Sequence, residues 1–297
     1  MSIKQTAEVF VFRSVLLFGR YLPRCLWSFK GRTLGLLFYF LDKNHRQIAY
    51  KNLSLAFGGT KPAKELKKIS RSSFKHYGEF LFSLSTFSAV HSPNRLGSLT
   101  VEGENHLDDA LKQKRGALLI SAHYGSWEMA PSFLSLKAPV NVIVRPLDNP
   151  AMEKRIREIR RGIGAKVIPK ANASKHILRA LSENEMVAIL MDQNVLRSQA
   201  VFVDFFGKKA ATTPGPAIFH LRTGAPLVPV FCYPIKQSKY CIKIEKPLIF
   251  TSEGNVEKDI LKITQACTKI IENQIKKEPR FWLWFHDRWR TRPKETD

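Results

Sequence analysis

Residues 116–128 read Gly116-Ala-Leu-Leu-Ile-Ser121 and then Ala122-His-Tyr-Gly-Ser-Trp-Glu128. The first half is a short apolar run that predicts a buried β-strand. The second half places His123 just beyond the strand end, with four residues between it and Glu128. Imidazole accepts a proton near neutral pH and a carboxylate can orient the ring, so the two residues fit proton abstraction. The structural alternative, a histidine that ends a strand and a glutamate that opens a helix, stays open on this motif alone.

Similar apolar runs follow Pro93 and alternate with helical patterns. The expected strands are 117–121, 140–144, 166–168, 187–190, 200–203, 227–231 and 241–245. The expected helices between them are 127–136, 151–163, 174–183 and 214–223. This alternation predicts an α/β fold with a layered sheet, on which two earlier helical stretches, 44–57 and 61–88, are expected to pack.

The charge balance indicates an anionic partner. The chain has 48 Lys and Arg against 25 Asp and Glu, a formal net charge of +23. Such a field suits nucleic acid or an anionic membrane. Twenty Phe and five Trp favour the membrane, where aromatic rings lie at the headgroup boundary. The four cysteines are scattered with no C-x-x-C pair, which predicts reduced, structural thiols in a cytoplasm-facing protein and no zinc site.

The N-terminal region is apolar but interrupted by basic residues. Its longest uncharged stretches, 14–19 and 33–41, are far shorter than the roughly 18–20 residues that span a bilayer. Arg13, Arg20 and Arg24 share one helical face, and Val9, Phe10, Phe12, Leu16, Leu17 and Phe18 lie on the others. Residues 1–42 are therefore predicted to form a membrane-interface helical segment that is retained, and 43–297 the main domain. An amphipathic helix packed on the main domain is one alternative, and a tilted single span with snorkelling arginines is the other.

Further polar residues follow predicted strands or end a helix. Arg145 comes after the strand 140–144, where a guanidinium suits a phosphate. Arg160 lies four residues before Gly164 and is expected to point back to the strand edge near His123, whereas the other cations of that helix fit a solvated face. Asp192 follows the strand 187–190, where it can hold substrate or an arginine, or form an Asx turn.

Three other segments carry less specific signals. The stretch 204–209 is expected to contact substrate or membrane in preference to the core. Pro229 inside a strand indicates an edge, a bulge or a close approach to ligand. The aromatic block 281–290 contains His286 and Asp287, but its composition favours a structural or membrane-facing role over a catalytic pair.

Motifs of several other enzyme classes are absent from the sequence: there is no G-x-S-x-G, Walker A, G-x-G-x-x-G or H-E-x-x-H motif. The chain resembles the bacterial lipid A biosynthesis (lauroyl/myristoyl) acyltransferases of the lysophospholipid acyltransferase superfamily. The resemblance covers about residues 8 to 290 and has an ordered set of motifs. They are Arg46-x-x-Ala49-x-x-Asn52-Leu53, His123-x4-Glu128, Val144-Arg-Pro-x-x-Asn149, Arg160-x-x-x-Gly164, Asp192-Gln193, Phe205-Phe-Gly207, Thr223-Gly-Ala225, Val228-Pro229 and Trp284-x-His286.

The resemblance implies a layered α/β/α mixed sheet like that of glycerol-phosphate acyltransferases. It implies transfer of a fatty acyl group from acyl carrier protein or CoA to a hydroxyl of a lipid A precursor, at the cytoplasmic face of the bacterial inner membrane. His123 would be the general base and Glu128 its partner; Arg145, Arg160 and Asp192 would bind substrate. No metal and no cofactor are implied. The implied partners are acyl carrier protein, a phosphorylated glycolipid and an anionic membrane.

Three alternatives remain at this stage. An acyltransferase for another lipid, such as a lysophospholipid, an ornithine lipid or a different glycolipid, has the same motifs. A nucleic-acid-binding protein is suggested by charge alone and has no supporting motif, so no nucleic acid partner is expected. A non-catalytic membrane scaffold is the third.

Overall fold

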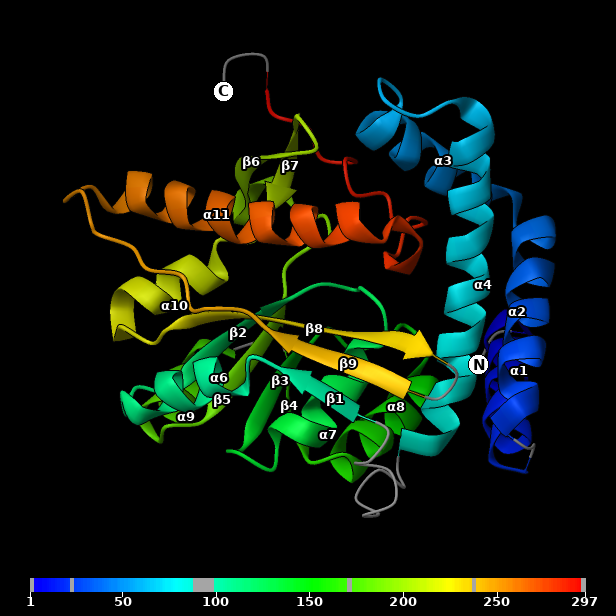
Figure 1. Cartoon of the computed structure of the whole chain (residues 1–297), viewed down its shortest axis with the longest axis horizontal. Coiled ribbons are helices and arrows are strands. Elements are labelled where there is room, and N and C mark those ends of the chain that lie inside the picture. The colour runs from blue at the N-terminus through cyan, green and yellow to red at the C-terminus, as the bar shows by residue number, and fades with distance from the viewer. Residues whose placement is uncertain (1–2, 22–23, 88–98, 170–172, 237–238, 295–297) are drawn as a thin grey trace.

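The computed structural model describes residues 3–21, 24–87, 99–169, 173–236 and 239–294. A seven-stranded sheet lies at its centre, in the order β1-β9-β8-β2-β5-β3-β4 (Figure 1). The neighbours pair in parallel except β8 and β9, which are antiparallel. The strands are β1 (Leu99–Glu102), β2 (Ala117–Ser121), β3 (Val140–Val144), β4 (Ala165–Pro169), β5 (Met186–Leu190), β8 (Leu227–Lys236) and β9 (Lys239–Ile244). The α/β prediction is confirmed.

Helices cover both faces of this sheet. One face carries α6 (Glu104–Lys112), α7 (Ala130–Leu134) and α8 (Pro150–Gly162), and the other α9 (Ala173–Ser182), α10 (Gly215–Thr223) and α11 (Val256–Lys277). The alternation of β2 separates the two cores, because Leu118 and Ile120 belong to one buried cluster and Ala117 and Leu119 to the other. Short 3-10 turns lie at Trp127–Met129, Arg197–Gln199 and Pro279–Phe281.

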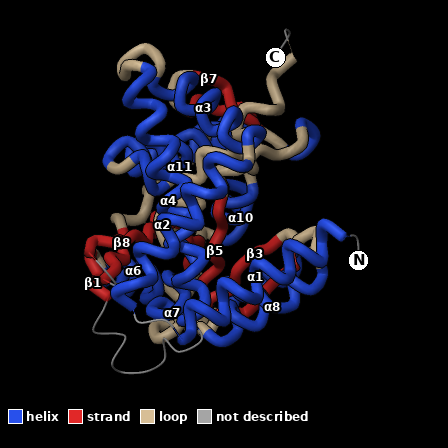
Figure 2. Tube along the Cα trace, turned by 90° about the vertical axis from the view of Figure 1, so that its right-hand side faces the viewer, coloured by secondary structure: helices blue, strands red, loops and turns tan. Residues whose placement is uncertain are grey.

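Four helices precede the sheet: α1 (Ile3–Tyr21), α2 (Arg24–Leu41), α3 (Lys43–Phe57) and α4 (Ala63–Phe87). Asp42 caps α3 by accepting a hydrogen bond from the backbone N–H of His45. Figure 2 shows α1, α2 and α4 side by side along one edge of the molecule. Glycines allow α2 and α4 to approach closely, since a Cβ added at Gly78 would lie 2.0 Å from the carbonyl oxygen of Gly31. The expected helices 44–57 and 61–88 are present, although Ser88 lies outside the described residues.

Side chains of α1 and α2 point both inward and outward. Phe12 and Leu16 are buried in the core that contains α8, whereas Phe10, Leu17 and Phe40 are exposed. The predicted amphipathic pattern depends on Phe18, Arg20 and Arg24. The structure describes the backbone of these residues but not their side chains. Within the described ranges, no helix is both long enough and apolar enough to cross a membrane.

One weaker expectation is wrong, and a second loses one of its three interpretations. Residues 204–209 lie in the hairpin formed by β6 (Val201–Phe205) and β7 (Lys208–Thr212), and Phe205 and Phe206 are buried in the core instead of facing substrate or membrane. Pro229 lies in an interior strand, at the end of the β2–β8 pairing, so the edge interpretation fails. The sequence patterns also missed β1, β7, α6 and α11.

Candidate active site

The site forms where β2 and β5 end. The two strands are parallel neighbours, with Ser121 opposite Leu190. His123 and Asp192 each lie two residues beyond that last pair. Because the carboxyl ends of parallel strands meet at one edge, residues nearly 70 positions apart come into contact.

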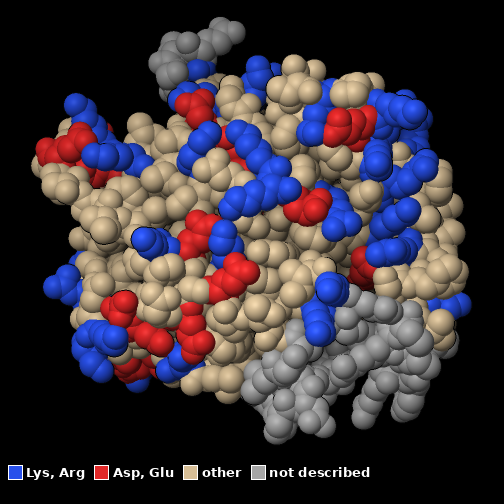
Figure 3. Space-filling view, viewed as in Figure 1, with Lys and Arg blue, Asp and Glu red and all other residues tan. Residues whose placement is uncertain are grey.

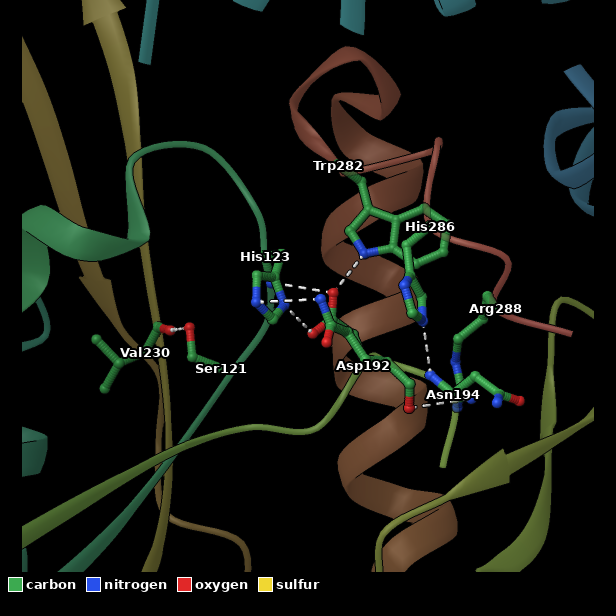
Figure 4. A network of polar contacts seen from close by, with 9 residues as sticks. Ser121, His123, Asp192, Asn194, Val230, Trp282, His286 and Arg288 are labelled. Carbon is green, nitrogen blue, oxygen red and sulfur yellow. Dashed lines mark hydrogen bonds and ion pairs between the residues drawn. The ribbon is translucent and has the colours of Figure 1, made fainter. Parts of the chain in front are cut away.

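His123 and Asp192 form a hydrogen-bonded dyad (Figure 4). The ring Nδ1 of His123 lies 2.9 Å from Asp192 Oδ1, and the backbone N–H of His123 donates to Oδ2 at 3.0 Å. Trp282 Nε1 also donates to Oδ2, at 2.8 Å. Burial by itself would raise the pKa of the Asp192 carboxyl, but the nearby His123 and these hydrogen bonds lower it. The carboxylate therefore stays ionised and holds the imidazole.

This geometry selects one tautomer of His123. A carboxylate only accepts, so Nδ1 carries the proton and Nε2 presents its lone pair. Gln193 Nε2 lies 3.3 Å from His123 Nε2, where an amide N–H can donate to that lone pair. The His123 side chain is 20% exposed and that of Asp192 2% exposed. A base nitrogen thus faces an accessible space, backed by a buried charge.

The expected contact between Glu128 and the His123 ring is replaced by another. Glu128 binds Arg160 through both carboxylate oxygens, with Arg160 Nε 3.2 and 3.0 Å from Oε1 and Oε2, and Nη2 2.5 Å from Oε1. Burial by itself would lower the pKa of Arg160, but the charge and hydrogen bonds of Glu128 raise it. The position of Arg160 near the end of α8 also suits the negative end of the helix dipole. Arg160 thus reaches back to the loop of His123, as expected, but its partner is Glu128.

The loop after β2, which carries His123 and Glu128, is held by α4 and by the C-terminal segment, where the Phe281 carbonyl accepts a hydrogen bond from the backbone N–H of Gly125. Gly125 has φ +64°, and a Cβ there would lie 2.3 Å from the carbonyl oxygen of Cys232. His76 Nε2 donates to the Gly125 carbonyl at 3.0 Å. Phe80 stacks on Trp127 with ring centroids 4.1 Å apart, and Trp127 meets the His123 ring edge-on at 5.2 Å. Side chains of α4 therefore fix the turn that carries His123.

The aromatic block 281–290 is buried and forms one wall of the site. Trp282, Trp284 and Trp289 belong to the core, which confirms a structural role and rules out the membrane-facing interpretation. His286 Nε2 accepts the backbone N–H of Asn194 at 3.0 Å. Burial, above all, lowers the pKa of His286 to about 4. Sequence analysis did not single out Trp282 or Gln193 for the site, and considered His286 only with Asp287.

A largely apolar pocket lies beside the dyad. Measured out to its solvent opening, it encloses about 560 Å³. Strands β2, β3, β5 and β8 and the turn after β2 contribute its walls. Its lining includes Leu119, Ser121, Trp127, Glu128, Leu134, Val142, Arg160, Ala188, Leu190 and Val230. Trp127 contacts both this pocket and the His123 ring.

The remaining candidates lie apart from the dyad. The Arg145 side chain is 79% exposed, and its ion pair with Asp148 spans 3.6 Å. Cys232, Cys241 and Cys267 are free and buried, as expected of structural thiols. Among the described residues, no cluster of three or more His, Cys, Asp or Glu side chains could hold a metal ion.

Comparison with known proteins identifies the family of the chain. The model of the bacterial lipid A biosynthesis acyltransferases matches residues 1–291. The chain belongs to this family. It is 29% identical to the lipid A biosynthesis palmitoleoyltransferase of Escherichia coli, over 92% of this chain and 87% of that protein. It is 28% identical to the lauroyltransferase of the same organism, over 89% and 85%.

A second group of relatives is named for a different acyl acceptor, phosphatidylinositol mannoside. The chain is 28% identical to a phosphatidylinositol mannoside acyltransferase of Mycobacterium tuberculosis, over 84% of this chain and 79% of that protein. Since the relatives are named as acyltransferases of lipid A or of phosphatidylinositol mannoside, the chain is assigned as an acyltransferase.

Proposed function

We propose that this acyltransferase moves a fatty acyl group from a thioester donor to a hydroxyl of a lipid A precursor, with His123 as the general base. One observation carries the proposal: in a member of the lipid A family, an imidazole backed by a buried carboxylate opens beside an apolar pocket. The names of the relatives, acyltransferases of phosphatidylinositol mannoside and of lipid A, are consistent with an acyl acceptor that is a glycolipid.

The reaction follows from the tautomer of His123. The acceptor hydroxyl gives its proton to Nε2 while its oxygen attacks the acyl carbonyl carbon, and the carbonyl electron pair moves to oxygen. When the carbonyl re-forms, the C–S bond breaks and the Nε2 proton passes to the leaving sulfur. Asp192 stabilises the imidazolium between these two steps. The products are an ester and a thiol.

Nearby hydroxyl and thiol groups support direct transfer without an acyl-enzyme. The Ser121 hydroxyl donates to the Val230 carbonyl at 2.6 Å, so it is committed to the sheet. Burial raises the pKa of the Cys232 thiol, which disfavours the thiolate that a nucleophile needs.

The apolar pocket suits the acyl chain. Its lining consists mainly of aliphatic side chains from the sheet and α7, and Trp127, which also lines it, contacts the His123 ring. A chain in this pocket would place its carbonyl carbon at the dyad. In this arrangement, Glu128 and Arg160 neutralise each other at the pocket wall and keep the turn after β2 in place.

The surface suits an anionic membrane and an acidic donor protein. Lys and Arg side chains gather over α3 and α4 (Figure 3), among them the exposed Lys64, Lys67, Lys68 and Arg71. Exposed apolar residues of α1 and α2, including Phe10, Phe29 and Phe40, adjoin these helices. We propose that this edge rests on the cytoplasmic face of the bacterial inner membrane, and that acyl carrier protein delivers the acyl group. The Arg145 side chain is 79% exposed and pairs with Asp148 across 3.6 Å at the surface, from where it can reach an acceptor phosphate.

Acyl transfer with purified protein tests the proposal. Labelled acyl–acyl carrier protein and acyl-CoA are each combined with a lipid A precursor, a lysophospholipid and a phosphatidylinositol mannoside. Transfer to the lipid A precursor that depends on His123 is expected. The mannoside is the second candidate acceptor because of the mycobacterial relatives, and transfer to it alone would replace lipid A in the proposal.

A further inference from the structure

The proposed reaction needs a hydrogen-bond donor for the carbonyl oxygen that becomes negative during attack. Such a donor lies about 3 Å from the oxygen and close to the base. This inference rests on the proposed acyl transfer, whose base is His123 Nε2.

Most donors around the dyad are already committed. The backbone N–H of His123 and the indole N–H of Trp282 both donate to Asp192. The backbone N–H of Asn194 donates to His286. The terminal nitrogens of the buried Arg288 donate to the Ala211 carbonyl and to the Thr212 hydroxyl, at 2.5 Å each. These groups hold the framework and are not free for substrate.

The Gln193 amide is different. Its nitrogen lies 3.3 Å from His123 Nε2, in the space that the reacting atoms must enter (Figure 4 shows the surrounding network). Among the described residues, the Gln193 side chain makes this one hydrogen bond. The backbone of Gln193 is fixed by its neighbour Asp192, whose carboxylate accepts three hydrogen bonds.

We propose that Gln193 is a catalytic residue whose amide N–H donates to the acyl carbonyl oxygen as it becomes an oxyanion. Binding of the acceptor brings about the exchange. When the acceptor hydroxyl donates to His123 Nε2, it displaces the Gln193 amide from that lone pair, so the amide N–H is free before the carbonyl electron pair moves to oxygen. The amide N–H can return to Nε2 after the proton has left with the sulfur.

The test compares Gln193→Met with Gln193→Glu in the labelled acyl transfer assay. Methionine keeps the length of the side chain without a donor, and glutamate keeps the shape but offers oxygens to the oxyanion. Both should lower kcat about 10²- to 10³-fold with little change in KM, because the interaction forms in the transition state. The exposed Gln199, outside the site, provides the matched control Gln199→Met, which should retain wild-type rates.

His286 gives the competing assignment. Its Nε2 is occupied by Asn194, so Nδ1 carries a proton and is a second candidate donor. His286→Met removes the ring and both of its nitrogens, so it leaves no N–H donor at this position, and a thermal melt measures the loss of the Asn194 contact. A wild-type kcat in Gln193→Met would overturn the proposal, and so would a 10²-fold loss confined to His286→Met. If the wild-type protein transfers no acyl group to any acceptor, the proposed function fails instead, which is a separate outcome.

Discussion

The two charged pairs of the site start from one loop and have opposite chemical character. His123 uses one ring nitrogen to bind Asp192 and leaves the other facing an accessible space. Glu128 has both oxygens bound by the guanidinium of Arg160. The first pair suits proton transfer and the second suits a fixed wall. Closeness in sequence did not decide the partners, because the register of β2 against β5 brings Asp192 to the ring.

The largest effect is expected from His123→Ala. Without the base nitrogen, kcat for acyl transfer should fall about 10⁴-fold, the upper range for a general base. The side chain is partly exposed at the end of a strand, so the far-UV circular dichroism spectrum and the melting temperature should stay near those of the wild type. Retention of more than a tenth of the activity would exclude His123 as the base.

The second largest effect is expected from Asp192→Asn, which should lower kcat about 10²- to 10³-fold. An amide can donate to Nδ1 and favour the wrong tautomer, and it cannot stabilise the imidazolium. Steady-state rates together with a thermal melt separate this loss from instability, because the buried site also has to accept the N–H groups of His123 and Trp282. Equal activity of Asp192→Asn and the wild type would show that the dyad has no catalytic role.

Glu128→Gln should act mainly on stability. It leaves Arg160 without its charged partner in a site where both side chains are mostly buried, at a cost of about 2–3 kcal/mol in the free energy of unfolding. Urea unfolding of Glu128→Gln, Arg160→Gln and the double variant measures the coupling. We expect the double variant to be far less destabilised than the sum of the single ones. Additive losses would mean that the ion pair does not form.

The smallest expected effect is on the pH dependence of stability and comes from His76, the α4 residue that hydrogen-bonds to the loop of His123. Burial lowers the pKa of His76 to about 4, whereas an unfolded histidine titrates near 6.5. Between these values the unfolded chain binds more protons, so stability falls as the pH decreases from about 6.5 to 4. His76→Gln keeps a donor for the Gly125 carbonyl without titrating. From pH 7 to pH 4.5 it should lose about 2 kcal/mol less stability than the wild type. Parallel losses in both proteins would contradict the assignment.

The sequence was sufficient to predict the central strands of the sheet and the sheet edge at which the site lies. Apolar runs marked β2, β3 and β5 within a residue, and each was followed by a polar side chain. It was insufficient for the partners of those side chains, because strand order is set by packing between distant segments. Spacing suggested Glu128 for His123, whereas β5 inserts between β2 and β3 and supplies Asp192.

Two other parts of the molecule were not predicted. The helix α11 has the periodicity of an amphipathic helix, which is a local signal, and it was missed because no motif marks it. The aromatic block resembled a membrane anchor in composition, yet Trp282 and Trp284 are buried by contacts with α3, α4 and the β6–β7 hairpin. Long-range burial of this kind leaves little local signal.

The central claim is that Asp192, and not Glu128, acts through His123. A double-mutant cycle in kcat/KM tests it most directly, with Asp192→Asn and Glu128→Gln each measured in the wild type and in His123→Gln. The account predicts that the effect of Asp192→Asn nearly disappears once His123 is replaced, while the effect of Glu128→Gln is unchanged. The reverse pattern, with Glu128 coupled to His123 and Asp192 independent of it, would contradict the account.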